Sequence, residues 1–204
     1  MENTRTKTSR NSLILLLTAA IWGMAFVSQS KGMDYMHPFT FNGVRSLIGA
    51  ASILVYILIS RKIAGDKAAP LDWKLNVKAG LLCGIFLTIA STLQQFGIKY
   101  TSVGKAGFIT TLYIIFVPMF GIFLKKKVAP VVWAAAVMAA VGMYLLCMTE
   151  SLRLGAGDIM VFLCAIAFAI QIMTVDHYAT RIDGAVVSCI QFTVCGVVCC
   201  IGAL

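Results

Sequence analysis

The most chemically distinctive residue of the sequence is an arginine inside a long apolar segment. Arg45 follows Pro38 by seven residues, about 10 Å along a helix that begins there, and its guanidinium stays charged at physiological pH. Such a group either extends toward the nearer membrane surface or lies in the interior, beside a wet cavity or a hydrogen-bonded partner. A polar face around it favours the interior, because Arg45 recurs at helical spacing with Asn42, Gly49, Ser52 and Tyr56.

Three further apolar segments carry polar or aromatic residues at helical spacing. A polar side chain facing lipid is costly, so these faces predict a protein or water interior. The residues are Thr18, Trp22, Ala25 and Gln29 in the first segment, Thr88, Ser91, Thr92, Gln95 and Lys99 in the third, and Lys105, Ile109, Tyr113 and Phe116 in the fourth.

Two lysines flank the short connection TSVG between the third and fourth segments. Lys99 and Lys105 continue the polar faces of their helices. One interpretation is that they are interfacial lysines at helix ends. The other is an electropositive vestibule on the outer side, which would attract anionic or zwitterionic solutes.

Other kinds of chemistry find little support in the sequence. All eight acidic residues fall in tails, loops or helix ends, which disfavours proton coupling through a buried carboxylate. No HExxH motif and no nucleotide-binding P-loop occurs, so the sequence does not support proteolysis or ATP-driven pumping. The seven cysteines lie in apolar segments without a metal-ligand spacing and are expected to be packing residues. We therefore expect no enzyme activity, cofactor, metal or disulfide.

The elements that position these residues are membrane-spanning helices. The chain has 204 residues, 60% of them apolar and 12% charged, with a mean hydropathy of +0.91. Continuous apolar runs of about 18 or more residues are long enough to cross a bilayer as helices, whereas barrels show alternating segments of about 10. The sequence predicts an all-α polytopic membrane protein with seven such runs, at 12–31, 38–59, 76–98, 103–124, 128–148, 157–176 and 184–204.

The net charge of +9 is explained by membrane topology better than by nucleic-acid binding. With the N-terminus in the cytoplasm, twelve basic residues fall inside and four outside, with Arg45 within the second segment, as the positive-inside rule requires. The inside set is Arg5, Lys7, Arg10, Arg61, Lys62, Lys67, Lys74, Lys78, Lys125, Lys126, Lys127 and Arg181; the outside set is Lys31, Lys99, Lys105 and Arg153. We expect a multi-pass protein of the plasma (inner) membrane.

The last two segments match the first two weakly. A shift of 146 residues without gaps places Trp22 on Phe168, Ser28 on Thr174, Pro38 on Gly184, Asn42 on Ser188 and Arg45 on Gln191. Because five segments separate the copies, the second copy enters the membrane from the opposite side. Opposite-facing repeats are the construction many secondary transporters use. Within the fourth segment, Pro118 predicts a kink.

Three stretches together resemble a known family. AIWGMAFVSQSKG, HPFTFNGVRSLIGA and LQQFGIKYTSVGKAGFITTLYIIFVPMFGIFLKKKVAP are similar to the EamA-like branch of the drug/metabolite transporter superfamily. The resemblance implies ten helices in two inverted five-helix repeats around a central cavity. It implies a cytoplasmic tail at 1–11, a first repeat at 12–148 and the start of a second repeat at 157–204, and hence a fragment or truncated product.

The prediction is a secondary transporter, an exporter or exchanger, of a small polar or amphipathic metabolite such as an amino acid. The sequence leaves a homodimer open. A lipid-linked carrier flippase is one alternative, and a non-transporting membrane scaffold or degenerate fragment is another. The residues expected to bind the solute are Trp22, Gln29, Asn42, Arg45, Gln95, Lys99, Lys105 and Tyr113.

Overall fold

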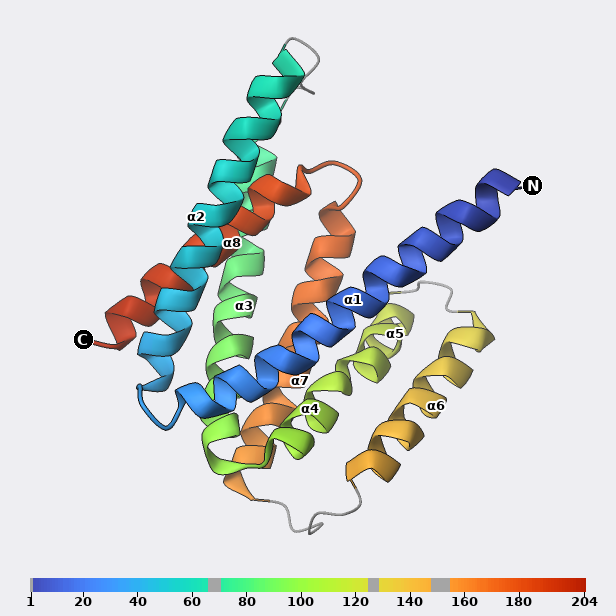
Figure 1. Cartoon of the computed structure of the whole chain (residues 1–204), viewed down its shortest axis with the longest axis vertical. Coiled ribbons are helices and arrows are strands. Elements are labelled where there is room, and N and C mark those ends of the chain that lie inside the picture. The colour runs from blue at the N-terminus through green and yellow to red at the C-terminus, as the bar shows by residue number, and fades with distance from the viewer. Residues whose placement is uncertain (1, 66–70, 125–128, 148–154) are drawn as a thin grey trace.

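The computed structural model describes residues 2–65, 71–124, 129–147 and 155–204, and these residues form helices and no strand (Figure 1). The helices are α1 (Glu2–Gly32), α2 (Pro38–Ala64), α3 (Trp73–Tyr100), α4 (Val103–Thr111), α5 (Tyr113–Phe123), α6 (Pro130–Cys147), α7 (Ala156–Tyr178) and α8 (Gly184–Gly202). Among the described residues, six segments are long and apolar enough to cross a membrane, one of which is α4 and α5 together, and α6 adds a shorter apolar stretch. The prediction of an all-α polytopic membrane protein is confirmed.

The helices coincide with the seven predicted apolar runs, with two differences. Helix α1 already begins at Glu2, so residues assigned to a tail are helical. The fourth run is divided at Leu112, between α4 and α5, and Pro118, where a kink is predicted, lies inside α5. Five of the basic residues used for the topology prediction, at 67, 125–127 and 153, lie outside the described residues.

Most helix starts follow from local sequence. Pro38 occupies the first turn of α2, where its missing N–H costs no hydrogen bond. Side chains of Asp72, Ser102 and Asp183 cap α3, α4 and α8 by accepting hydrogen bonds from the free backbone N–H groups of the first turn. These caps fix where each helix enters the bundle.

Helix α3 lies at the centre of the bundle and packs against both α7 and α8, and α2 packs along α8 (Figure 1). Glycines of α3 and α7 lie against each other. A Cβ on Gly157 would lie 2.8 Å from the backbone O of Gly97, and a Cβ on Gly97 would lie 2.9 Å from the O of Gly157. Glycine at both positions therefore lets the two backbones touch.

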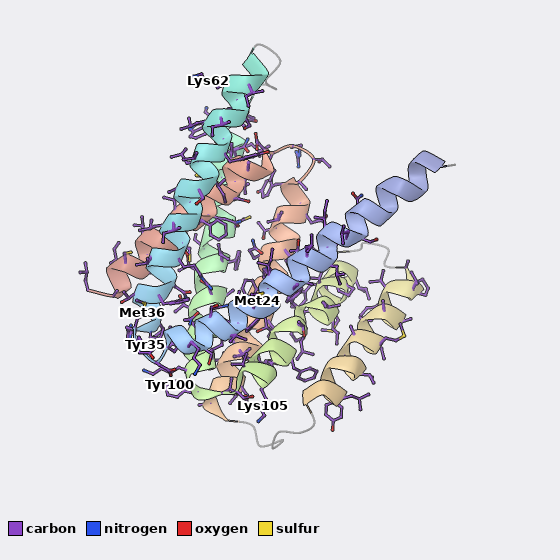
Figure 2. The ribbon with its side chains drawn as sticks, viewed as in Figure 1. Met24, Tyr35, Met36, Lys62, Tyr100 and Lys105 are labelled. Carbon is purple, nitrogen blue, oxygen red and sulfur yellow. The ribbon has the colours of Figure 1, made fainter. Side chains whose placement is uncertain are left out.

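The bundle has two ends, which we name from Figure 1. The lower end contains the α1–α2 turn, the α3–α4 turn and the start of α7; the upper end contains the end of α2, the start of α3 and the α7–α8 turn. Figure 2 shows Tyr35, Tyr100 and Lys105 at the lower end and Lys62 at the upper end. Helix α6 lies at the edge, against α4 and α5.

Candidate functional site

A cavity of about 350 Å³ lies between α1, α2, α3 and α8, with one residue from α7. We call it the Arg45 cavity. Its polar lining residues are Gln29, Arg45, Ser46, Ser91, Gln94 and Cys195, and its other lining residues are Ile21, Trp22, Ala25, Phe26, Gly49, Leu87, Phe168 and Phe192. A mostly apolar wall with a few polar groups is typical of a small-molecule site.

Arg45 is held in place by a buried asparagine. Asn42 is fully buried; its Nδ2 donates to the backbone O of Ser91 at 2.9 Å, and its Oδ1 accepts from Arg45 Nη2 at 2.9 Å. The guanidinium carbon also lies 5.6 Å from the centroid of the Phe41 ring. Among the described residues no carboxylate forms an ion pair with Arg45. The guanidinium thus keeps its positive charge available to a solute in the cavity.

A buried glutamine lies in the wall of the same cavity as Arg45. Gln29 is 5% exposed, lines the cavity, and its Oε1 has no hydrogen-bond partner among the described residues. An unpartnered buried acceptor costs about 1–3 kcal/mol, so a donor from a solute or water would be bound favourably there. The lining of the cavity therefore contains one cationic donor, Arg45, and one glutamine whose buried carbonyl has no partner among the described residues.

A thiol of α8, that of Cys195, forms part of the cavity wall. The Sγ of Cys195 lies 3.4 Å from the Oγ of Ser46 and 3.4 Å from the Oγ of Ser91. These contacts join α8 to α2 and α3. The final segment of the chain thus contributes directly to the cavity.

Three of the predicted site residues line the cavity, and two others support it. Trp22, Gln29 and Arg45 line it, and Asn42 lies behind Arg45. Gln95 is fully buried behind Gln29, and its Nε2 donates to the backbone O of Gln29 at 3.3 Å.

The remaining three predicted residues lie elsewhere. Tyr113 packs against the cluster formed by α3 and α7 around Ala90 and Phe168. Lys99 is exposed near the lower end. Lys105 forms an ion pair with Asp158 at 3.6 Å, and the two side chains are 19% and 3% exposed. The structure thus brings Lys105 to the contact between α4 and α7.

Asp158 is held by several groups besides Lys105. Its carboxylate accepts a hydrogen bond from the Thr101 hydroxyl and another from the backbone N of Gly155 at 2.9 Å. These bonds close the first turn of α7 and attach it to the α3–α4 turn. Asp158 is one of the eight acidic residues expected in tails, loops or helix ends, and its partners were not predicted.

Several lining residues contributed by α2, α3 and α8 were missed from the sequence. Gln94, Ser46, Phe192 and Cys195 were not named as candidates, yet they line the cavity. The signal that could have found two of them is the shift of 146 residues. Three pairs related by this shift line the cavity with both members: Trp22 with Phe168, Ser46 with Phe192, and Gly49 with Cys195.

Comparison with known proteins agrees with this architecture. Residues 10–148 match the model of the EamA-like transporter family. The chain is 31% identical over 171 residues to an uncharacterized transporter of Archaeoglobus fulgidus, an alignment that covers 81% of this chain and 48% of that protein. The chain thus spans about half the length of the curated relative it matches. No solved structure matches. With more than half of its length matched, the chain belongs to the EamA-like transporter family.

Proposed function

We propose that the protein is a secondary transporter, an exporter or exchanger, of a small amphipathic metabolite that carries a carboxylate, such as an amino acid. The observation that carries the proposal is the placement of Arg45 in the cavity wall without an acidic partner among the described residues. A guanidinium binds a carboxylate through charge-assisted hydrogen bonds, each contributing about 1.5–3 kcal/mol.

The other lining residues support an amphipathic solute. The unpartnered Oε1 of Gln29 would accept from an ammonium or other N–H group, and Trp22 and Phe168 would contact an apolar side chain. A volume of about 350 Å³ suits a small metabolite better than the large head group of a lipid-linked carrier. We assign no chemical step to any residue.

The proposed orientation follows the charge bias of the connections. With the N-terminus in the cytoplasm of the cell, the lower end faces outward, and Arg45 lies about 10 Å from that end of α2. Binding from the outer half and release toward the upper end, or the reverse, would then require the helices to change their packing.

The test is uptake into vesicles that contain the purified protein, with a panel of labelled amino acids and anionic metabolites. We expect uptake of at least one carboxylate solute, a fall of 10-fold or more for Arg45→Gln, and partial retention for Arg45→Lys. Lys62→Gln is the matched control, because it removes a charge from an exposed position of the same helix. Equal uptake by Arg45→Gln and the unmodified protein would remove Arg45 from the site, and no uptake of any solute would favour a scaffold.

A further inference from the structure

A second pocket, of about 320 Å³, lies between α7 and α8 and shares no lining residue with the Arg45 cavity. We call it the Gln191 pocket. Its polar lining is Gln171, Ser188 and Gln191. The Nε2 of Gln171 donates to the Oε1 of Gln191 at 3.1 Å.

The Gln191 pocket is related to the Arg45 cavity by the internal repeat. The shift of 146 residues places four residues of the Arg45 cavity, Ala25, Phe26, Gln29 and Arg45, on four residues of the pocket: Gln171, Ile172, Val175 and Gln191. Half of the eight residues that line the Gln191 pocket therefore correspond to lining residues of the Arg45 cavity.

The two pockets lie toward opposite ends of the bundle. Arg45 follows the first residue of α2 by seven positions, and Gln191 follows the first residue of α8 by seven. Helix α2 begins at the lower end and α8 at the upper end (Figure 1). Each side chain is thus about 10 Å along its helix from a different end.

The chemistry of the two pockets differs at the corresponding positions. The cation Arg45 is replaced by the neutral Gln191, and the small Ala25 of the same cavity is replaced by Gln171. No charged residue is among those that line the Gln191 pocket within the described part of the chain. The bond between the two amides uses one N–H of Gln171 and the carbonyl of Gln191, so the carbonyl of Gln171 and the two N–H groups of Gln191 are not used by it.

A pair of amides in this arrangement suits a neutral group that both donates and accepts hydrogen bonds. A carboxamide or adjacent hydroxyls fit this description. A carboxylate fits less well, because neutral amides offset the loss of its hydration less than a guanidinium does.

We propose that the Gln191 pocket is a second solute site, the upper-end counterpart of the Arg45 cavity, which takes a neutral carboxamide or hydroxyl group and does not select for anions. The proposal deepens the proposed function, since a solute moving between the two ends would meet a cationic site at one and a neutral site at the other. Its test measures occupancy rather than transport, so either idea can fail without the other.

The experiment follows the labelling rate of one introduced thiol by uncharged methyl methanethiosulfonate, in the full chain with its seven cysteines replaced by alanine. Ser188→Cys reports the Gln191 pocket and Ser46→Cys the Arg45 cavity. Protection is measured with N-acetyl-leucine, an anion, and N-acetyl-leucinamide, a neutral amide of nearly the same shape.

We expect N-acetyl-leucinamide to protect the Ser188→Cys thiol at least as well as N-acetyl-leucine does. At Ser46→Cys the anion should protect at about tenfold lower concentration than the amide. The paired change Gln171→Ala with Gln191→Arg should give the Gln191 pocket a preference for the anion, and Ala25→Gln with Arg45→Gln should remove that preference from the Arg45 cavity.

A Ser188→Cys thiol that does not react in folded protein, or that neither compound protects, would overturn the proposal. If the cysteine-free chain does not fold, equilibrium dialysis with labelled N-acetyl-leucinamide applies to the chain with its native cysteines. There the paired Gln171→Ala and Gln191→Arg change should weaken binding of the amide by about tenfold. Unchanged binding would contradict the proposal as well.

Discussion

The ammonium of Lys105 lies 3.6 Å from the carboxylate of Asp158 and joins the first turn of α4 to the first turn of α7. Both side chains are largely buried, so removing Lys105 leaves the Asp158 carboxylate without a counter-ion, although it keeps its hydrogen bonds from Thr101 and Gly155. We expect Lys105→Met to lower the free energy of unfolding by about 3 kcal/mol. Thermal unfolding in detergent micelles measures the change.

The matched control for this pair is the neighbouring lysine. Lys99 is exposed, and Lys99→Met should change stability by less than about 0.5 kcal/mol. Combining Lys105→Met with Asp158→Asn should cost less than the two single changes added together, because no charge is left unpaired. Additive losses would show that the two residues do not stabilise each other.

A second ion pair, at the upper end, should behave differently. Arg61 lies 3.5 Å from Asp183, and each side chain is 38% exposed. Arg61→Gln should therefore change stability by less than about 1 kcal/mol. If Arg61→Gln lowered the free energy of unfolding as much as Lys105→Met does, burial would not explain the difference between the two ion pairs.

Asp183 should matter more as a helix cap than as an ion-pair partner. Its Oδ1 accepts from the backbone N of Ala185 at 3.0 Å and of Val186 at 3.3 Å. We expect Asp183→Ala to cost about 1 kcal/mol, whereas Asp183→Asn, which can still accept these bonds, should cost only a few tenths. Equal losses of unfolding free energy for the two variants would show that Asp183 stabilises the protein through its charge and not through its capping hydrogen bonds.

The contact of α3 with α7 at Gly97 and Gly157 leaves no room for a methyl group. Because a Cβ on Gly157 would meet backbone atoms, Gly157→Ala must separate the helices, and we expect a loss of about 2 kcal/mol. Gly107→Ala is the control, since a Cβ there has nothing within 4 Å; it should be neutral or stabilising by about 0.5–1 kcal/mol. Unfolding curves of both variants test the difference.

Substitution of Gln29 should weaken solute binding without lowering the free energy of unfolding. Gln29→Leu removes an acceptor that has no partner among the described residues, so stability should stay the same or rise by about 1 kcal/mol. Binding of a solute with an N–H donor should weaken by about tenfold. The quenching of Trp22 fluorescence, with Trp73 and Trp133 replaced by phenylalanine, measures this binding. Undiminished binding would exclude Gln29 as the acceptor.

The positions of the helices could be predicted from the sequence because each is a long apolar run, and hydropathy alone identifies such runs. The period of 3.6 residues also identified the faces of α1 and α2 that carry Trp22, Gln29 and Arg45. These residues line the cavity because the polar faces of both helices border the same space.

Helical spacing could not predict which neighbour each polar face meets. Gln94 and Gln95 differ by one position, about 100° around the helix, and only Gln94 lines the cavity, while Gln95 packs behind Gln29. The partner of Lys105 is Asp158, 53 residues later, and no local pattern connects them. Such pairings are set by how α7 packs on α3 and α4, which requires coordinates.

The touching glycines of α3 and α7 also restrict how the bundle can move. Gly97 and Gly157 lie near the lower end, so a rigid rotation of α7 that keeps this contact has its fulcrum there. Displacement in such a rotation grows with distance from the fulcrum. A tilt of about 10° over a helix of 20 residues, about 30 Å long, moves the far end by about 5 Å. In such a rotation the upper end of α7 would move by this distance, while its lower end would hardly move.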